Sequence, residues 1–191
     1  MDTLKRFATT LWDLLKTPLK SAAPVSPSDV KVLRSPRSKN KSAENTKPMQ
    51  RRYDALVDEM KTTYEFKVRK WRSSTSGCAW EVKGVDGSLG RLIESPYPRG
   101  PMSCVVFLHE VGHHAIGFNR YRPRCLEEYH AWEWALAMMK TKQFNITKAV
   151  LRRRDIALRY AVDKARRRGL KRLPVELIPW KGHLVLTEDI H

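Results

Sequence analysis

The sequence predicts an α+β fold in which a small three-stranded sheet is followed by three long helices. Apolar and polar residues alternate over 64–71, and the short segments 79–82 and 89–93 complete the predicted strands. Turn residues at 84–88 join the last two strands, so we expect an antiparallel-type sheet. Beyond residue 103, three long helices are expected, two of them ended by Gly117 and Gly169. The chain has 191 residues, enough for one hydrophobic core with appendages.

Two segments are expected to precede the folded domain. Over residues 1–20 apolar side chains recur at helical spacing, which predicts an amphipathic helix that docks on the domain or a partner, or lies on a membrane surface. Residues 21–50 are rich in Ser, Pro and Lys and predict a disordered basic linker. The domain is expected over 51–142. It opens with a short amphipathic helix whose apolar residues are Tyr53, Leu56, Val57 and Met60.

Local signals mark the three long helices. The first is expected over 103–116, where Gly117 can stop it, and the second over about 124–142, with apolar residues on more than one side. The third follows Thr147, a plausible N-cap, and ends at Gly169. It belongs to a C-terminal segment, 143–191, which we expect to pack a basic helix and a short β-like tail on the domain.

Basic charge is confined to the flanks of the chain. The net charge is +17, yet residues 53–139 carry 11 basic and 11 acidic residues, whereas residues 140–172 carry 13 and 2. Such segregation predicts contact with nucleic-acid phosphates without sequence reading. A solvated face or contact with an anionic membrane is the alternative. The side chains expected to make the contact are Arg152, Arg153, Arg159, Arg166, Arg167, Lys171 and Arg172.

Cysteine usage and hydropathy indicate the compartment. Cys78, Cys104 and Cys125 show neither disulfide nor metal-binding spacing, which fits a reducing environment. No run approaches ~18 continuous apolar residues, so no membrane span is expected. We expect an intracellular protein, in the cytoplasm or on the nucleoid, without a signal peptide; a phage or mobile element is a candidate source.

The strongest functional motif is His109-Glu110-Val111-Gly112-His113. Two histidines four positions apart lie on one face of a helix, so both imidazoles can bind one metal ion, and Zn²⁺ is the expected cofactor. Glu110 can then accept a proton from a zinc-activated water as the general base. The alternative is a helix with two solvated histidines.

A catalytic zinc site needs a third protein ligand, and the second long helix offers Glu127, Glu128 and His130. Glu128 has Ala131 at i+3 and Ala135 at i+7, and such small residues let two helices approach closely. The sequence therefore favours Glu128, with Glu127 and His130 as alternatives.

The two motifs together show a family resemblance. Leu108-His109-Glu110-Val111-Gly112-His113-His114, followed by Glu128-Tyr129-His130-Ala131-Trp132-Glu133-Trp134-Ala135, resembles the ImmA/IrrE family of small zinc peptidases. The resemblance covers roughly residues 51–140. It implies a minimal zincin-like domain, in which the sheet packs against the two motif helices. The site residues that it implies are His109, His113 and Glu128 as zinc ligands and Glu110 as general base.

Two points separate this chain from the family. Trp132 stands where the family has a polar residue, so the hydrogen bond usual at that position is in doubt. The flanking segments are also unlike those of the repressor-cleaving members. SprT-type proteases, which have a third histidine ligand and nucleic-acid-binding flanks, are the competing resemblance and would require His130 as the ligand.

The sequence thus predicts a zinc metallopeptidase that hydrolyses peptide bonds, with nucleic-acid-associated proteins as its substrates. Peptide hydrolysis also needs a hydrogen-bond donor for the oxyanion. The candidates are Tyr121, Tyr129, His130 and His114. The alternative is a nucleic-acid-binding or structural protein, of the phage or mobile-element type, with an ancillary or inactive zinc site.

Overall fold

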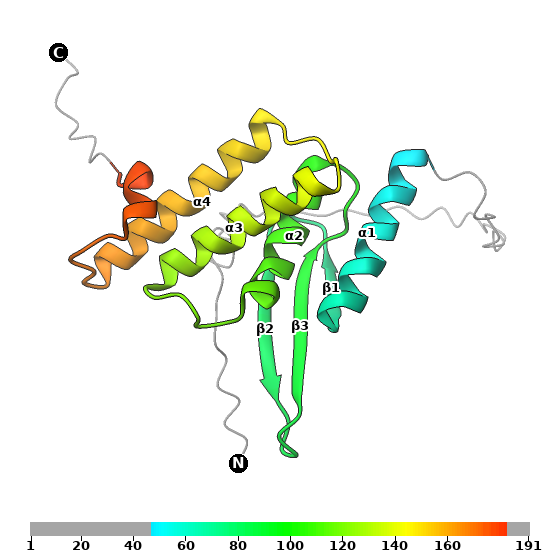
Figure 1. The fold of residues 1–191 in the computed structure, drawn as a ribbon, viewed down its shortest axis with the longest axis horizontal. Coiled ribbons are helices and arrows are strands. Elements are labelled where there is room, and N and C mark those ends of the chain that lie inside the picture. Colours follow the sequence, from blue (N-terminus) through cyan, green and yellow to red (C-terminus); the bar gives the residue numbers. More distant parts are fainter. Residues whose placement is uncertain (1–46, 183–191) are drawn as a thin grey trace, which may run out of the picture.

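The computed structural model describes residues 47–182 as helices packed on a small sheet (Figure 1). The predicted N-terminal helix, nearly all of the predicted linker and the end of the tail lie outside the described residues. In chain order the elements are α1 (Pro48–Tyr64), β1 (Phe66–Arg72), β2 (Cys78–Lys83), β3 (Leu89–Pro96), α2 (Pro101–Ile116), α3 (Arg124–Thr141), α4 (Lys148–Arg167) and the 3-10 helix η3 (Val175–Trp180). The α+β class and the three long helices are confirmed.

The sheet is mixed, which corrects the expected antiparallel arrangement. Its strand order is β1-β3-β2, and β3 runs parallel to β1 but antiparallel to β2. The β2–β3 hairpin forms as the turn residues predict. The short link at 73–77 carries the chain from β1 to the far side of β3, so β3 inserts between the first two strands. Among the described strands, β2 and β1 are therefore the edges.

Helix α1 begins earlier than the predicted domain boundary. Pro48 occupies its first turn, where a missing N–H costs no hydrogen bond, so residues 48–50 belong to the helix rather than to a linker. Its predicted apolar face is confirmed and packs towards α2 and β1. The four residues on that face are buried: Tyr53, Leu56, Val57 and Met60.

Helix α2 lies between the sheet and α3, and α4 lies against α3 (Figure 1). Residues 104–114 of α2 are all buried, because both faces of the helix are covered. Its start is set by Pro101 and by Ser103, whose hydroxyl accepts the Gly100 N–H. At its end, Gly117 has a φ of 81°, a conformation that suits glycine and stops the helix as predicted.

The C-terminal segment differs from its predicted form. Thr147 caps α4 as expected, since its hydroxyl accepts the Val150 N–H at 3.2 Å. The expected β-like run, however, is the 3-10 helix η3. Pro174 and Pro179 restrict the backbone there, and the helical turn buries Leu177 against α3 and α4. Over the described part of the chain, no helix has the length and apolar character needed to cross a membrane.

Candidate metal centre

Helices α2 and α3 bring two histidines and a glutamate together. One oxygen of Glu128, Oε2, lies 3.3 Å from His109 Nε2 and 3.6 Å from His113 Nε2. Candidate ligand atoms of the three residues all lie within 4.8 Å of one another. Three ligands at tetrahedral zinc distances of about 2.0–2.1 Å are themselves roughly 3.3 Å apart, so this donor set fits the ion.

The helices meet closely because glycine and alanine stand where they cross. A Cβ atom added to Gly112 of α2 would lie 2.9 Å from the backbone oxygen of Ala131 in α3. Ala131 and Ala135 are fully buried in this contact region, as the small-residue spacing beside Glu128 predicted. The close packing places the Glu128 carboxylate over the histidine face of α2.

The electrostatics of the cluster favour a cation at its centre. Burial alone would lower the pKa of His113, but the carboxylates of Glu128 and Glu127 outweigh it and raise that pKa to about 9. Burial lowers the pKa of His109 to about 4. Although burial raises the pKa of Glu128, the facing histidines bring it well below its usual value. The carboxylates that stabilise a proton on His113 also favour a metal ion between these groups.

A second carboxylate supports the cluster from behind. Glu127 is 1% exposed, and its Oε1 lies 3.5 Å from His113 Nδ1 and 2.7 Å from Arg124 Nη1. Its Oε2 accepts the Asn119 N–H at 2.8 Å. The Arg124 Nε also donates to Glu128 Oε1 at 3.2 Å, which leaves Oε2 towards the histidines. Arg124 therefore fixes both glutamates, and the sequence analysis did not identify this role.

Trp132 packs against the first histidine. Its ring stacks on His109 with centroids 4.4 Å apart and planes 25° from parallel. Among the described residues, His109 Nδ1 has no hydrogen-bond partner. Packing against the Trp132 indole and the contact between His109 Nε2 and Glu128 Oε2 therefore orient this imidazole together.

Glu110 is 1% exposed and lies beside the metal-ligand group. Burial raises the pKa of its carboxyl to about 8. Its Oε2 has no hydrogen-bond partner within the described part of the chain. On the other side, the carboxyl packs so tightly against Gly77 that a Cβ at this glycine would overlap it. Gly77 thus leaves the space that the carboxyl occupies.

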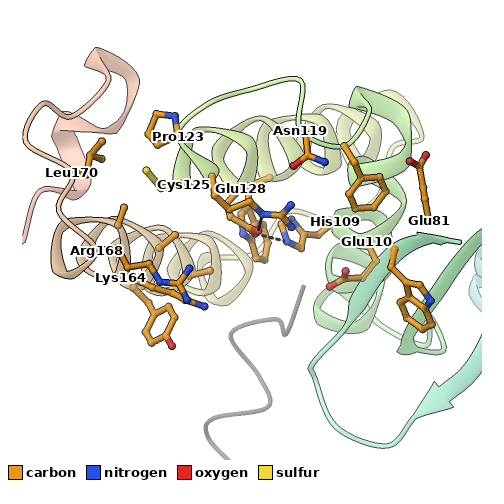
Figure 2. Close-up of a pocket in the computed structure, with 18 of the residues that line it drawn as sticks. Glu81, His109, Glu110, Asn119, Pro123, Cys125, Glu128, Lys164, Arg168 and Leu170 are labelled. Atoms are coloured by element: carbon orange, nitrogen blue, oxygen red, sulfur yellow. Dashed lines mark hydrogen bonds and ion pairs between the residues drawn. The ribbon is translucent and has the colours of Figure 1, made fainter. Parts of the chain in front are cut away.

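The cluster opens into a cavity of about 920 Å³ (Figure 2). Helices α2 and α3 supply the floor of this cavity, which we define by His109, Glu110 and Glu128. Strand β2 lines it with Trp80, Glu81 and Lys83. Helix α4 forms another wall, and its lining residues are Ala157, Tyr160, Ala161, Lys164, Ala165 and Arg168.

The four predicted oxyanion donors do not line this cavity. His114 is buried beneath the sheet, with Nε2 3.2 Å from the Leu92 carbonyl oxygen. The His130 ring stacks on Tyr121 with centroids 3.8 Å apart, and Tyr129 lies beside His130. His130 is also absent from the metal-ligand group. Tyr160, which the sequence analysis missed, is the tyrosine among the cavity residues.

The residues predicted to contact nucleic acid differ in the exposure of their side chains. Arg152, Arg159, Arg166 and Arg167 of α4 are exposed, as are Lys171 and Arg172 beyond it. Arg153 differs, because it is half-buried and its guanidinium donates to the Thr75 carbonyl at 2.7 Å. Burial lowers the pKa of Arg153 to about 10. This arginine links α4 to the β1–β2 connection.

Comparisons of the chain with protein-family models, curated proteins and solved structures found no match. The function of the site is therefore inferred from its own residues.

Proposed function

We propose that the protein is a zinc-dependent metallopeptidase. The observation that carries the proposal is the meeting of His109, His113 and Glu128 beside the buried carboxyl of Glu110, at the floor of an open cavity. The two histidines and Glu128 would hold the ion. A bound zinc ion supplies Lewis-acid chemistry, polarising a peptide carbonyl and lowering the pKa of water.

Glu110 would move the proton during hydrolysis. Its unpartnered Oε2 can accept a proton from the attacking water and pass it to the leaving amine. The second oxygen lies against Gly77, so the carboxyl has little freedom to turn away.

The cavity can admit an extended peptide. Strand β2 is an edge of the sheet among the described strands and lines the cavity. An edge strand can pair its backbone with a peptide chain, and side-chain pockets then provide selectivity. The volume of about 920 Å³ exceeds what a single side chain fills, and so it suits a few peptide residues.

We also propose that the chain is a minimal zincin-like peptidase of the ImmA/IrrE type. Support comes from Glu128, which lies against both histidines, while His130 lies apart from them on Tyr121. The SprT-type alternative would need His130 at the metal. Trp132 and the basic α4 are features in which this chain departs from the ImmA/IrrE pattern.

Nucleic acid is the proposed partner of the exposed arginines. Arg152, Arg159 and Arg166 recur every seven residues and so share one side of α4, and all three are exposed. Contact with phosphates would hold the peptidase near proteins bound to nucleic acid. If the metal site proves inactive, the alternative function is nucleic-acid binding with an ancillary zinc site.

Metal analysis and peptide cleavage test the proposed function together. We expect purified protein to bind one zinc ion, His109→Ala to lose it, and Glu110→Gln to retain it. Wild-type protein should cleave an unstructured protein such as casein, and Glu110→Gln should not. A wild-type protein that binds zinc without cleaving any peptide mixture would favour the nucleic-acid-binding alternative.

A further inference from the structure

We propose that the cavity selects peptides that carry a carboxylate, which Lys164 and Arg168 on the α4 wall bind. This inference deepens the proposed function and rests on it for the statement that the bound peptide is a substrate. The α4 wall is defined here by Tyr160 and Lys164 of α4 and by Arg168, which caps the end of the helix; the three follow one another at four-residue intervals and line the same cavity.

The α4 wall faces the metal centre across the cavity. Lys164 and Arg168 line the same cavity as His109 and Glu128, and Figure 2 shows them extending from α4 towards that group. Ala157, Ala161 and Ala165 also line the cavity from α4. Because these side chains are small, they leave space between the long cationic groups and the floor. A peptide at the metal centre would therefore lie within reach of both cations.

The cations of this wall are available to a ligand. Within the described part of the chain, no carboxylate lies within ion-pair distance of Lys164 or Arg168. The Lys164 ammonium lies over the Tyr160 ring, 5.9 Å from its centroid, a contact that leaves its N–H donors unused. Burial and the nearby positive charge of Arg168 lower the pKa of Lys164. An anion placed between the two cations would relieve that repulsion.

The carboxylates already in the cavity do not compete for this role. Glu128 is held by Arg124 and the two histidines. Glu110 lies against Gly77. Glu81, on the opposite wall, lies 3.7 Å from Arg91. A carboxylate brought in by the peptide is therefore the group that Lys164 and Arg168 can bind.

A peptide carboxylate fits better than a nucleic-acid phosphate. The cavity lies between α4 and β2, with room for a few peptide residues rather than a duplex. The exposed arginines at 152, 159 and 166 lie outside this cavity and are the proposed surface for nucleic acid. A guanidinium and an ammonium four residues apart can hold the two oxygens of one carboxylate through charged hydrogen bonds. The carboxylate can belong to an Asp or Glu side chain or to the peptide C-terminus.

Peptide binding to zinc-loaded Glu110→Gln protein tests the inference without cleavage. Three fluorescent peptides that differ only at the central residue or at the C-terminus would be compared by anisotropy. The first has a central Asp and an amidated end, the second has Asn in its place and an amidated end, and the third is the Asn peptide with a free C-terminus. We expect at least one carboxylate peptide to bind about tenfold more tightly than the amidated Asn peptide, the size of a charged hydrogen bond. The Asp arm and the free-terminus arm identify the source of the carboxylate.

Variants of α4 and α3 locate the selectivity. Lys164→Gln/Arg168→Gln should remove the preference for a carboxylate and leave binding of the neutral peptide within twofold. Lys140→Gln/Lys148→Gln removes the same charge from exposed positions outside the cavity and should keep the preference. The inference would be overturned if zinc-loaded Glu110→Gln bound all three peptides equally. It would also be overturned if the two double variants lost the preference for a carboxylate to the same extent.

Two further outcomes separate the inference from the proposed function. If wild-type protein cleaves the three peptides at equal rates and binds them equally, the peptidase stands and the selectivity is overturned. If no peptide is cleaved but the preference depends on Lys164 and Arg168, the peptidase proposal fails and the cavity is a carboxylate-binding site. Displacement of the Asp peptide by a short oligonucleotide that shows the same dependence on Lys164 and Arg168 would assign the wall to phosphate instead.

Discussion

The floor of the cavity and the α4 wall use charge in opposite ways. On the floor, the metal-ligand group is held by charged neighbours: Glu128 meets both histidines, and Arg124 holds Glu128 and Glu127. On the α4 wall, Lys164 and Arg168 meet no carboxylate of the described chain. Chemistry at a metal requires groups fixed in advance, whereas recognition requires groups left available to a ligand. One cavity would thus combine the proposed reactive side, where the metal-ligand group is fixed by its neighbours, with the proposed binding side, where the cations have no carboxylate partner among the described residues.

Loss of the Glu110 carboxylate should give the largest effect, because it removes the proposed general base. We expect Glu110→Gln to lower the rate of peptide cleavage by about 10²–10⁴-fold. Zinc content should be unchanged, since Glu110 is outside the metal-ligand group. The measurement is initial cleavage rate at saturating zinc. A rate within tenfold of wild type would remove Glu110 from the mechanism.

The two neighbouring glutamates should differ in their effect on metal affinity. Glu128→Gln removes a proposed ligand and should weaken zinc binding by more than about 100-fold, whereas Glu127→Gln removes only the support of His113 and should weaken it by about 10–100-fold. Competition with a coloured zinc chelator measures both. A larger loss in Glu127→Gln than in Glu128→Gln would reverse the two roles.

The sequence predicted the floor better than the wall, and the reason is the range of the signals. The histidine spacing and the alanines beside Glu128 act within one helix or between two consecutive helices, so a local pattern reports them. Which side of α4 faces the cavity depends on packing across the whole domain. The charge count therefore identified α4 as basic. It selected residues such as Arg152 and Arg159 for nucleic-acid contact, but it did not indicate that Lys164 and Arg168 line the cavity.

The sheet shows the same limit. Alternation predicted the first strand, and short segments bounded by turn residues predicted the other two, because these signals depend on residues in or next to each strand alone. The order of the strands in the sheet depends on contacts between different segments, and no local sequence pattern indicates that β3 lies between β1 and β2. Likewise, the apolar run at 175–178 is typical of a strand. No strand of the described sheet pairs with it, and the segment instead forms a 3-10 turn that buries Leu177.

Helix contact beneath the floor can be tested at Gly112. Gly112→Ala should lower the free energy of unfolding by about 2 kcal/mol, since the added methyl meets a backbone oxygen that cannot move without the helix. Gly90→Ala is the control, because an added Cβ there meets nothing closer than 3.6 Å. Urea denaturation of both variants gives the comparison. Equal stability of Gly112→Ala and wild type would show that the floor does not depend on this close approach.

The paired charges extend from the floor to the sheet, where Glu94 tests their pH dependence. Burial raises the pKa of Glu94, but hydrogen bonds from Arg72 and Arg69 outweigh it and bring the pKa below 4.5. The ion pairs therefore stabilise the fold above the unfolded-state pKa, and this stability is lost as pH falls through the folded-state value. Glu94→Gln should cost about 2 kcal/mol at pH 7, with a smaller difference from wild type below pH 4. Urea denaturation across pH 3–7 measures it, and a difference independent of pH would contradict the assignment.

The smallest effect is expected from substitution of one exposed arginine on the outer side of α4. This variant tests whether DNA binding and peptide recognition use different sides of the helix. Arg159→Gln removes one exposed charge and should lower the slope of log affinity for duplex DNA against log salt by about 0.9 if that arginine contacts one phosphate. Peptide selectivity should not change, because Arg159 lies outside the cavity of the metal centre. Lys164→Gln/Arg168→Gln should show the converse, losing peptide selectivity with little change in the DNA slope. If Arg159→Gln and Lys164→Gln/Arg168→Gln each change both the DNA salt slope and the peptide selectivity, the two sides of α4 act as one electrostatic surface. Peptide recognition by the α4 wall and phosphate contact by the outer side could then not be separated.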